Sequence, residues 1–236
     1  MLIRDDGETW TAIGQPAHAA LAGQLAAAWA TPLGHDVILA TSQHDIAWSE
    51  WDLRPPLNAK ARRAASFYET PIEQRLRSWE RVDRRLEAQS PYAALLVSMH
   101  ATNIHTRYGK PEHRPVAFLE RTRAAQDELI ARLADQGVTR DGAERDADLV
   151  FGLDAISLAL CLGRPEVVVE SLGHEPIRVT IEQGSATVDP WPFAGSELVV
   201  HVAARTFSER FDDEDALHRA MDEAPYDCWE WRLHQA

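Results

Sequence analysis

The sequence predicts a mainly α fold, with a helical body over residues 1–163 followed by a small β-rich (α+β) subdomain over residues 164–236. Two observations carry this prediction. Apolar residues recur at helical spacing between Gln15 and Leu162, whereas short runs rich in Val, Ile and Thr alternate with Gly and Pro after Gly163. We find no internal repeat and no low-complexity linker, so the change near residues 163–175 indicates a subdomain seam more than a flexible hinge.

The helical body is expected to begin with two short strands within residues 1–13, joined by a turn at Asp5-Asp6-Gly7. Pro16 fits the first turn of a helix, and Ser90-Pro91 is a favourable cap and first-turn pair for another. The expected helices cover residues 16–29, 35–52, 71–88, 91–105, 115–136 and 144–162. Residues 57–70 are predicted to form an irregular loop.

The C-terminal part is expected to be a small sheet. Its strands are predicted near residues 167–169, 177–181, 186–188, 198–202 and 228–233, with a short acidic helix at 212–223. The two N-terminal strands could join this sheet. The sheet would then either cover a pocket mouth or provide a dimer edge, and the sequence does not decide between these roles.

Composition limits the partners of the chain. The formal net charge is -13, from 37 acidic and 24 basic residues, which disfavours a broad nucleic-acid surface. A small anionic substrate remains compatible, because a local basic pocket can oppose the global charge. The start of the chain is acidic where a signal peptide is apolar, and residues 149–162 are too short to span a bilayer. We therefore expect a cytoplasmic protein with a small-molecule substrate and no membrane partner. A homodimer is compatible with the sequence.

His18 is the first candidate metal ligand. It shares one face of its predicted helix with Leu21, Leu25 and Trp29, so its side chain is expected to point inward. A histidine in an apolar core needs a hydrogen-bond partner or a metal. Taken alone, His18 is as well explained by a satisfied core histidine.

Two His-Asp dipeptides, at residues 35–36 and 44–45, lie in the predicted helix 35–52. Nine residues correspond to about 900°, so the two dipeptides face opposite sides of a regular helix. The first begins the helix, where Asp36 suits the positive end of the helix dipole. His44 and Asp45 lie mid-helix and are the stronger metal candidates, and Trp48, one turn after His44, could form a pocket wall or simply pack in the core.

His100 and Asp154 interrupt two other apolar helices. A carboxylate in such surroundings costs several kcal/mol unless it is paired or bound to a metal, so a salt bridge is the alternative for Asp154. His100 is a candidate ligand or acid–base group. His105 follows at about 140° around the helix and becomes a candidate only if the helix has already ended.

Four basic residues in predicted loops are candidates for binding an anionic substrate. They are Arg62, Arg63, Arg107 and Lys110, which follow the second and fourth predicted helices. Guanidinium and ammonium groups in such loops can hold phosphate or carboxylate. For each residue alone, ordinary surface charge is the simpler explanation. The two cysteines are far apart and form no CxxC pair, which disfavours a cysteine zinc site.

Residues 15–29 (QPAHAALAGQLAAAW), 44–52 (HDIAWSEWD), 92–100 (YAALLVSMH) and 154–161 (DAISLALC) resemble an uncharacterised bacterial family described only as a domain of unknown function. The likeness extends to the DPWPF segment at 189–193. More widely, residues 15–162 resemble the HD-domain superfamily of metal-dependent enzymes. That resemblance implies an HD-like helical bundle in which His18, His44, Asp45 and Asp154 hold a metal, with His100 as a further ligand.

Three functions follow from these observations and from the resemblance. The first is a metal-dependent hydrolase of a small phosphorylated or nucleotide-like substrate, with Asp45 and His100 in catalytic roles. It would use one or two divalent ions per chain, of Mn, Fe, Co, Ni, Zn or Mg. The second is an HD-type di-iron oxygenase or oxidase, in which His100, and His105 if the helix allows, would hold a second iron. The third is a binding module whose histidines are structural.

Overall fold

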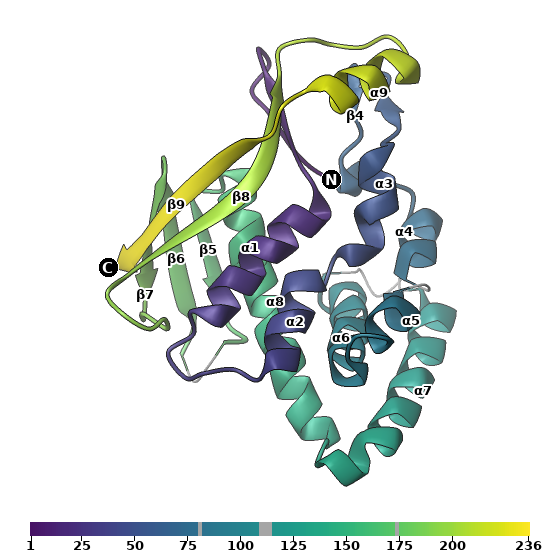
Figure 1. Ribbon diagram of the computed structural model, residues 1–236, viewed down its shortest axis with the longest axis vertical. Helices are drawn as coiled ribbons and strands as arrows, with labels where there is room; N and C mark the ends of the chain where they lie inside the picture. Colours follow the sequence, from purple (N-terminus) through teal and green to yellow (C-terminus); the bar gives the residue numbers. More distant parts are fainter. Residues whose placement is uncertain (80–81, 109–114, 173–174) are drawn as a thin grey trace.

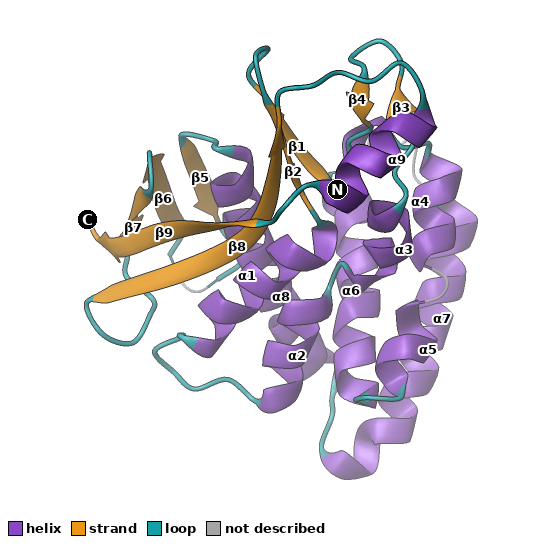
Figure 2. Cartoon of the chain, turned by 45° about the horizontal axis from the view of Figure 1, so that its top comes forward, coloured by secondary structure: helices purple, strands orange, loops and turns teal. Residues whose placement is uncertain are grey.

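One curled sheet of seven strands joins the two ends of the chain in the computed structural model (Figures 1 and 2). The structure describes residues 1–79, 82–108, 115–172 and 175–236. The strands are β1 (Leu2–Asp5), β2 (Trp10–Ile13), β5 (Glu166–Val169), β6 (Ile177–Glu182), β7 (Ser185–Asp189), β8 (Glu197–Phe207) and β9 (Asp227–Gln235). Their order is β1-β2-β8-β9-β7-β6-β5. Only β7 and β9 pair in parallel among these neighbours.

The prediction of a mainly α fold with a small appended β-rich subdomain is wrong. The chain has an α/β fold, because the sheet is large and is built from both ends of the sequence. β2 pairs with β8 in a register that places Trp10 opposite Phe207. Strands as short as β1 and β2 take their stability from partners that are remote in sequence, which a local pattern cannot reveal. The expectation that the N-terminal strands join the sheet is confirmed.

Helices cover the concave side of the sheet and extend away from it (Figure 2). They are α1 (Gln15–Ala27), α2 (His35–Gln43), α3 (Ser49–Leu53), α4 (Ile72–Trp79), α5 (Val82–Glu87), α6 (Pro91–Arg107), α7 (Val116–Leu133), α8 (Arg140–Leu162) and α9 (Glu214–Glu223). Short 3-10 turns lie at Ile46–Trp48, Phe67–Glu69 and Ala134–Gln136. A small ribbon of β3 (Leu57–Asn58) and β4 (Arg63–Ala64) lies within the predicted loop 57–70.

Local signals placed several helix ends correctly. The Ser90 hydroxyl accepts a hydrogen bond from the Ala93 amide at 3.1 Å, and Pro91 occupies the first turn of α6, as predicted. Gly163 ends α8 with φ at 64°, in the left-handed region that glycine adopts without strain. No helix among the described residues is both long and apolar enough to cross a membrane.

Two hydrophobic cores meet along α8. The first lies between the sheet and α1, and α8 contributes Leu153, Ile156 and Leu160 to it. The second is formed by α2, α6, α7 and the N-terminal half of α8, which contributes Ala143, Ala147 and Val150. Asp154 therefore lies where the two cores adjoin, in the middle of the molecule.

Gly23 permits the close approach of α1 and α2. A Cβ atom at this position would lie 2.5 Å from the Cβ of Ser42 and 2.9 Å from its Cα. Any larger residue would push the two helices apart, because the obstacle includes backbone. The contact brings the side chain of His18, on α1, next to the end of α2.

Candidate metal centre

Four helices converge on one buried cluster of histidines and aspartates. His18 comes from α1, His44 and Asp45 from the end of α2, His100 from α6 and Asp154 from α8. Each exposes 7% or less of its surface. Two overlapping groups, one of His18, His44 and Asp154 and one of His44, Asp45 and His100, offer ligand atoms within 4.8 Å of one another. The structure thus brings together all five residues predicted as metal ligands.

The predicted helix over residues 35–52 is wrong, and the difference shapes the cluster. α2 ends at Gln43, and Asp45 leaves helical geometry with φ at −109° and ψ at 18° before a 3-10 turn and α3 follow. His44 and Thr41 both make side-chain hydrogen bonds to backbone carbonyls of α2, which compete with continuation of the helix. Adjacent side chains of a regular helix diverge by about 100°, whereas this break lets both His44 and Asp45 face the cluster.

At His18, two hydrogen-bond acceptors face each other: the ring Nε2 and a carboxylate oxygen of Asp45. The Ser157 hydroxyl donates its only hydrogen to the Asp154 carbonyl oxygen at 3.0 Å, so its oxygen accepts from Nδ1 of His18 at 2.9 Å. In a neutral ring Nε2 then carries the lone pair, yet it lies 2.7 Å from Oδ2 of Asp45. A shared proton or a metal ion satisfies both atoms.

His44 has a similar arrangement, with one ring nitrogen on a backbone carbonyl and the other facing a carboxylate. Its Nδ1–H donates to the carbonyl of Thr41 at 2.8 Å, which leaves Nε2 facing Oδ1 of Asp154 at 3.2 Å. Burial lowers the pKa of His44, but the nearby Asp154 carboxylate outweighs burial and raises that pKa to about 9. Burial conversely raises the pKa of Asp154, while the neighbouring His44 charge prevails and lowers it to about 2. Without a metal, a proton therefore bridges this pair.

Several distances inside the cluster are close to those between neighbouring ligands of a metal ion. Metal–ligand bonds of about 2.1 Å place neighbouring ligand atoms roughly 3.0–3.4 Å apart. The His18–Asp45 and His44–Asp154 contacts of 2.7 Å and 3.2 Å lie near this range, and His44 Nε2 is 3.8 Å from Asp45 Oδ2. Imidazole nitrogen and carboxylate oxygen together suit Zn, Mn, Fe, Co or Ni. The donor set therefore fits the divalent metal expected from the sequence.

His100 completes the cluster from the side of α6. It is fully buried, and neither ring nitrogen has a hydrogen-bond partner among the described residues. Its Nε2 lies 3.8 Å from Oδ2 of Asp154, and its ring packs near Trp79 and Phe151 at centroid distances of 6.1 and 5.9 Å. Burial and the nearby His44 lower the pKa of His100 to about 4, so its ring is neutral and keeps a lone pair.

A cavity of about 380 Å³ opens beside this cluster. Asp45, His100 and Asp154 contribute to its lining, and Trp48 lies in its wall. The other lining residues are Gln15, Phe67, Tyr68, Arg75, Trp79, Ile104, His105, Tyr108, Ala155, Leu158, Arg164 and Val167. The cavity thus combines aromatic walls, two arginines and three of the candidate ligands, a combination typical of a small-molecule site.

Sequence reasoning missed Gln15, Arg75 and Arg164 as cavity residues. Arg75 lies on α4, in a segment with many charged residues, a composition typical of a solvent-exposed helix. One signal was present, because Arg75 and Trp79 stand four residues apart and so share a helix face. His105 also lines the cavity, although α6 continues to Arg107 and His105 belongs to neither ligand group.

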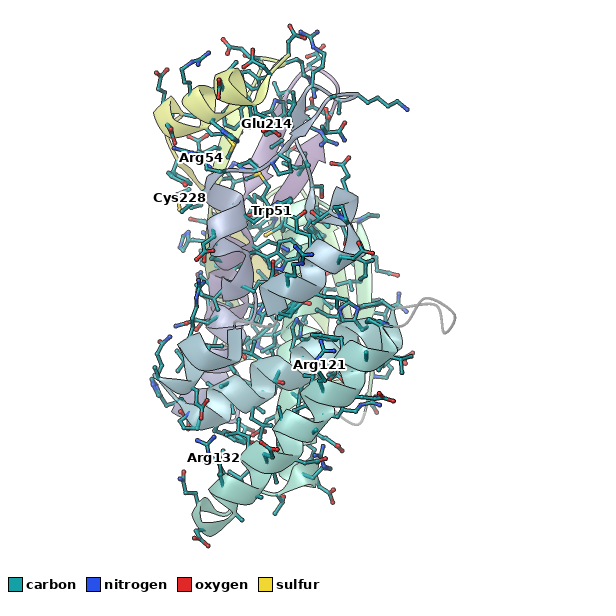
Figure 3. The ribbon with its side chains drawn as sticks, turned by 90° about the vertical axis from the view of Figure 1, so that its right-hand side faces the viewer. Trp51, Arg54, Arg121, Arg132, Glu214 and Cys228 are labelled. Atoms are coloured by element: carbon teal, nitrogen blue, oxygen red, sulfur yellow. The ribbon has the colours of Figure 1, made fainter. Side chains whose placement is uncertain are left out.

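A wider groove of about 930 Å³ lies elsewhere, bordered by α3, α4 and α9. Its lining includes Trp51, Arg54 and Glu214, which Figure 3 labels on one side of the molecule. None of the five candidate ligands contributes to it. Of these two hollows, it is the smaller cavity through which a small molecule could reach the cluster.

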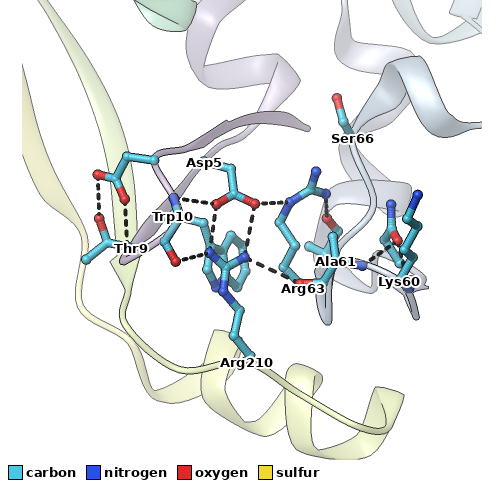
Figure 4. A network of polar contacts seen from close by, with 12 residues as sticks. Asp5, Thr9, Trp10, Lys60, Ala61, Arg63, Ser66 and Arg210 are labelled. Atoms are coloured by element: carbon cyan, nitrogen blue, oxygen red, sulfur yellow. Dashed lines mark hydrogen bonds and ion pairs between the residues drawn. The ribbon is translucent and has the colours of Figure 1, made fainter.

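Arg62 and Arg63, predicted to bind substrate, do not line the cavity. Arg63 Nε donates to Asp5 at 2.9 Å, within a network in which Arg210 holds the same carboxylate (Figure 4). Arg62 pairs with Asp212 at 2.9 Å. These residues tie the N-terminal turn to the segment before α9, because β3 and β4 fold the predicted loop over that turn.

Arg107 and Lys110 are the other two residues predicted to bind an anionic substrate. Arg107 pairs with Asp148 and lies 4.7 Å from the centre of the Phe151 ring, outside the cavity lining. Lys110 lies outside the described residues. The cations that do line the cavity, Arg75 and Arg164, come from α4 and from the end of α8.

Comparison with known proteins gives one family. Residues 1–209 match the model described as "Protein of unknown function (DUF3891)". No curated protein and no solved structure matches the chain. The match covers strands β1 and β2, all five candidate ligands and most of the sheet. The chain therefore belongs to the DUF3891 family.

Proposed function

We propose that the chain is a metal-dependent hydrolase of a small phosphorylated substrate. One observation carries the proposal: Nε2 of His18 and Nε2 of His44 each face a carboxylate oxygen, while their Nδ1 atoms are committed to Ser157 and Thr41. In metal sites, a hydrogen bond from the ring nitrogen that faces away from the ion fixes the imidazole tautomer. Their presence at both histidines supports a site built for a metal ion.

His18, His44, Asp45 and Asp154 would hold the ion. A bound divalent metal would supply a nucleophile from water near neutral pH and polarise a phosphoryl oxygen. In hydrolysis the water oxygen bonds to phosphorus while the ester P–O bond breaks. His100, neutral and facing the cavity, would take the proton from water and return it to the leaving oxygen. Arg75 and Arg164 would oppose the negative charge of the substrate.

The ligand order His, His-Asp, Asp supports the same reaction class. It is the order used by HD-type phosphohydrolases, which the sequence resembles. The relation we propose is limited to this ligand set, because the seven-stranded sheet departs from a helical HD bundle.

An HD-type di-iron oxygenase is the second candidate, and the position of His100 favours it. With His44 and Asp45, His100 forms a second possible ligand group that overlaps the first. The aromatic walls of the cavity, which include Trp48 and Trp79, would suit a drier reaction site. Two irons per chain would be expected in this case, held by the two overlapping ligand groups.

Element-resolved mass spectrometry of the purified protein tests the metal. We expect about one divalent ion per chain, lost in Asp45→Ala and retained in Asp36→Ala, which alters the partly exposed dipeptide at the start of α2. Two irons per chain would move the assignment to the oxygenase. No metal in the wild-type protein, even after reconstitution, would leave a binding module.

A panel of phosphomonoesters and phosphodiesters tests the reaction. The metal-loaded protein should release inorganic phosphate or a phosphomonoester from at least one small substrate, and Asp45→Ala should not. His100→Ala should keep the metal and lose most of the rate, since a positioned acid–base group contributes typically 10²–10⁴-fold. A loaded protein that is inert on the whole panel contradicts the hydrolase proposal.

A further inference from the structure

We propose that Arg75 and His105 bind a second anionic group of the substrate, a carboxylate or phosphate, separate from the phosphoester at the metal centre. This inference rests on the proposed function for the identity of the reacting group. It assigns a substrate class: small molecules with an anionic group at each end. The evidence comes from residues that line the cavity and carry a buried polar atom without a hydrogen-bond partner among the described residues.

Arg75 is a half-buried cation that lacks an ion pair within the described part of the chain. Its Nε is buried and has no hydrogen-bond partner there, and Arg75 is one of the residues that line the cavity. Nearby surface arginines differ, because Arg85 pairs with Glu50 and Arg107 with Asp148. A guanidinium presents donors in a fork that fits carboxylate or phosphate, and leaving them unpaired at a buried site is costly.

His105 supplies a second donor at the same end. It exposes 8% of its surface, and its Nε2 has no hydrogen-bond partner among the residues that the structure describes. Burial and the charge of Arg75 lower the pKa of His105 to about 4, so the ring is neutral. A neutral imidazole protonated at Nε2 can donate one hydrogen bond to an anion.

The Arg75–His105 pair is set apart from the metal centre. His105 follows His100 by five residues on α6, which corresponds to roughly 7 Å along the helix axis. Among the described residues that line the cavity, the carboxylates are Asp45 and Asp154, and both belong to the metal cluster. No acidic side chain of the lining is therefore left to neutralise Arg75, and a substrate anion can fill that role.

The rest of the cavity limits what lies between the two charged ends. Trp48, Phe67 and Trp79 offer apolar surface, and Gln15 presents a buried Oε1 that has no donor among the described residues. An unpaired acceptor of this kind fits a hydroxyl or amide N–H of the ligand. At about 380 Å³ the cavity is near the lower end of small-molecule sites. The expected ligand is therefore short and carries a hydrogen-bond donor in addition to its two anionic groups.

Calorimetry with inorganic phosphate and with succinate tests the inference on the full chain. The set comprises wild type, Arg75→Gln, Arg75→Lys, the control Arg77→Gln and Asp45→Ala, and all are first compared by circular dichroism. Arg77 is exposed on the same helix and does not line the cavity. We expect Arg75→Gln to weaken binding of at least one probe about tenfold or more, Arg75→Lys to weaken it less, and Arg77→Gln to leave it within twofold.

Asp45→Ala separates this inference from the proposed function. The Arg75–His105 site predicts that this variant still binds the probe, whatever its metal content. If anion binding is lost in Asp45→Ala and unchanged in Arg75→Gln, the probe binds only at the metal centre and the inference is overturned. Equal affinities of Arg75→Gln and Arg77→Gln, or no binding to the wild type, overturn it as well. If the protein binds the probe but holds no metal, the anion-site inference is supported and the hydrolase proposal is contradicted.

Discussion

His44 donates its Nδ1–H to the carbonyl oxygen of Thr41, one turn earlier in α2, at 2.8 Å. A carbonyl can only accept, so this bond determines the tautomer of His44 without any assumption about hydrogen positions. Nε2 is left facing Asp154 at 3.2 Å. The backbone of α2 thus directs the Nε2 lone pair of His44 toward the Asp154 carboxylate in α8. Two such acceptors can lie this close only if a proton or a metal ion lies between them.

If that cation is a metal, added metal should stabilise the fold. A ligand at 100 times its Kd contributes about 2.7 kcal/mol, which corresponds to roughly 5–10 °C in Tm for a chain of this size. We expect this rise in wild type and its loss in Asp154→Asn. The control is Asp148→Asn, on the same helix as Asp154, which alters a surface ion pair with Arg107 of α6. Differential scanning calorimetry with and without chelator measures both, and a rise of equal size in Asp154→Asn would contradict the assignment.

Ser157 should matter for metal affinity although it is not a ligand. Its hydroxyl fixes His18 by accepting from Nδ1 at 2.9 Å while donating to the Asp154 carbonyl. Ser157→Ala should weaken metal binding by about 10–100-fold, the usual effect of removing such a support. Competition with a chromogenic chelator measures the affinity. Ser98→Ala removes a buried hydroxyl that contacts Gln126 instead, and its affinity should stay at the wild-type value.

Gly23→Ala should damage the fold and the centre together. The added Cβ would lie 2.5 Å from the Cβ of Ser42, so α1 and α2 must separate. Overpacking of this kind costs typically 1–3 kcal/mol, and here the separation also moves His18 away from Asp45. Urea denaturation and metal titration measure the two effects. Gly34→Ala meets nothing within 4 Å and serves as the control. If Gly23→Ala is as stable as that control, the close approach is not needed.

Three members of the His–Asp cluster were predictable from sequence because each is a polar residue in an apolar helix. His18, His100 and Asp154 stand out against their neighbours, and burial makes a partner necessary. The break at residues 44–45 was not predictable, because Thr41 and His44 end α2 through side-chain bonds that compete with an otherwise adequate helical pattern.

The sheet and the cavity cations were harder to predict for a different reason. β2 pairs with β8, and Thr11 lies 195 residues from Thr206, its cross-strand partner. The sequence pattern indicated these short strands and that they could join the C-terminal sheet, but the register and extent of the whole sheet depend on pairing between residues far apart in the chain. The choice of cations was equally non-local: Arg63 found Asp5 as its partner, while Arg75 lines the cavity.

The Asp5 network offers a pH-dependent test of how the N-terminal strands are held. Arg210 donates to both carboxylate oxygens of Asp5, at 2.7 and 3.0 Å, and Arg63 adds a third bond (Figure 4). The Arg210 hydrogen bond, joined by Arg63, holds the pKa of Asp5 well below its usual range. These contacts connect the turn after β1 to β4 and to the segment after β8.

The pKa of Asp5 is lower in the folded protein than in the unfolded chain, where it is about 3.9. The ionised Asp5 carboxylate therefore contributes fully to the free energy of unfolding above that pH, and this contribution is lost as the pH falls toward the folded-state pKa. Asp5→Asn should therefore destabilise the protein by about 1 kcal/mol between pH 5 and 8, a figure kept small because the network is partly solvated. The difference from wild type should shrink below about pH 4. Urea denaturation across this range measures it, with Glu8→Gln as the exposed control in the same turn. A difference that persists unchanged at the acidic end would mean that Asp5 acts through turn geometry and not through its charge.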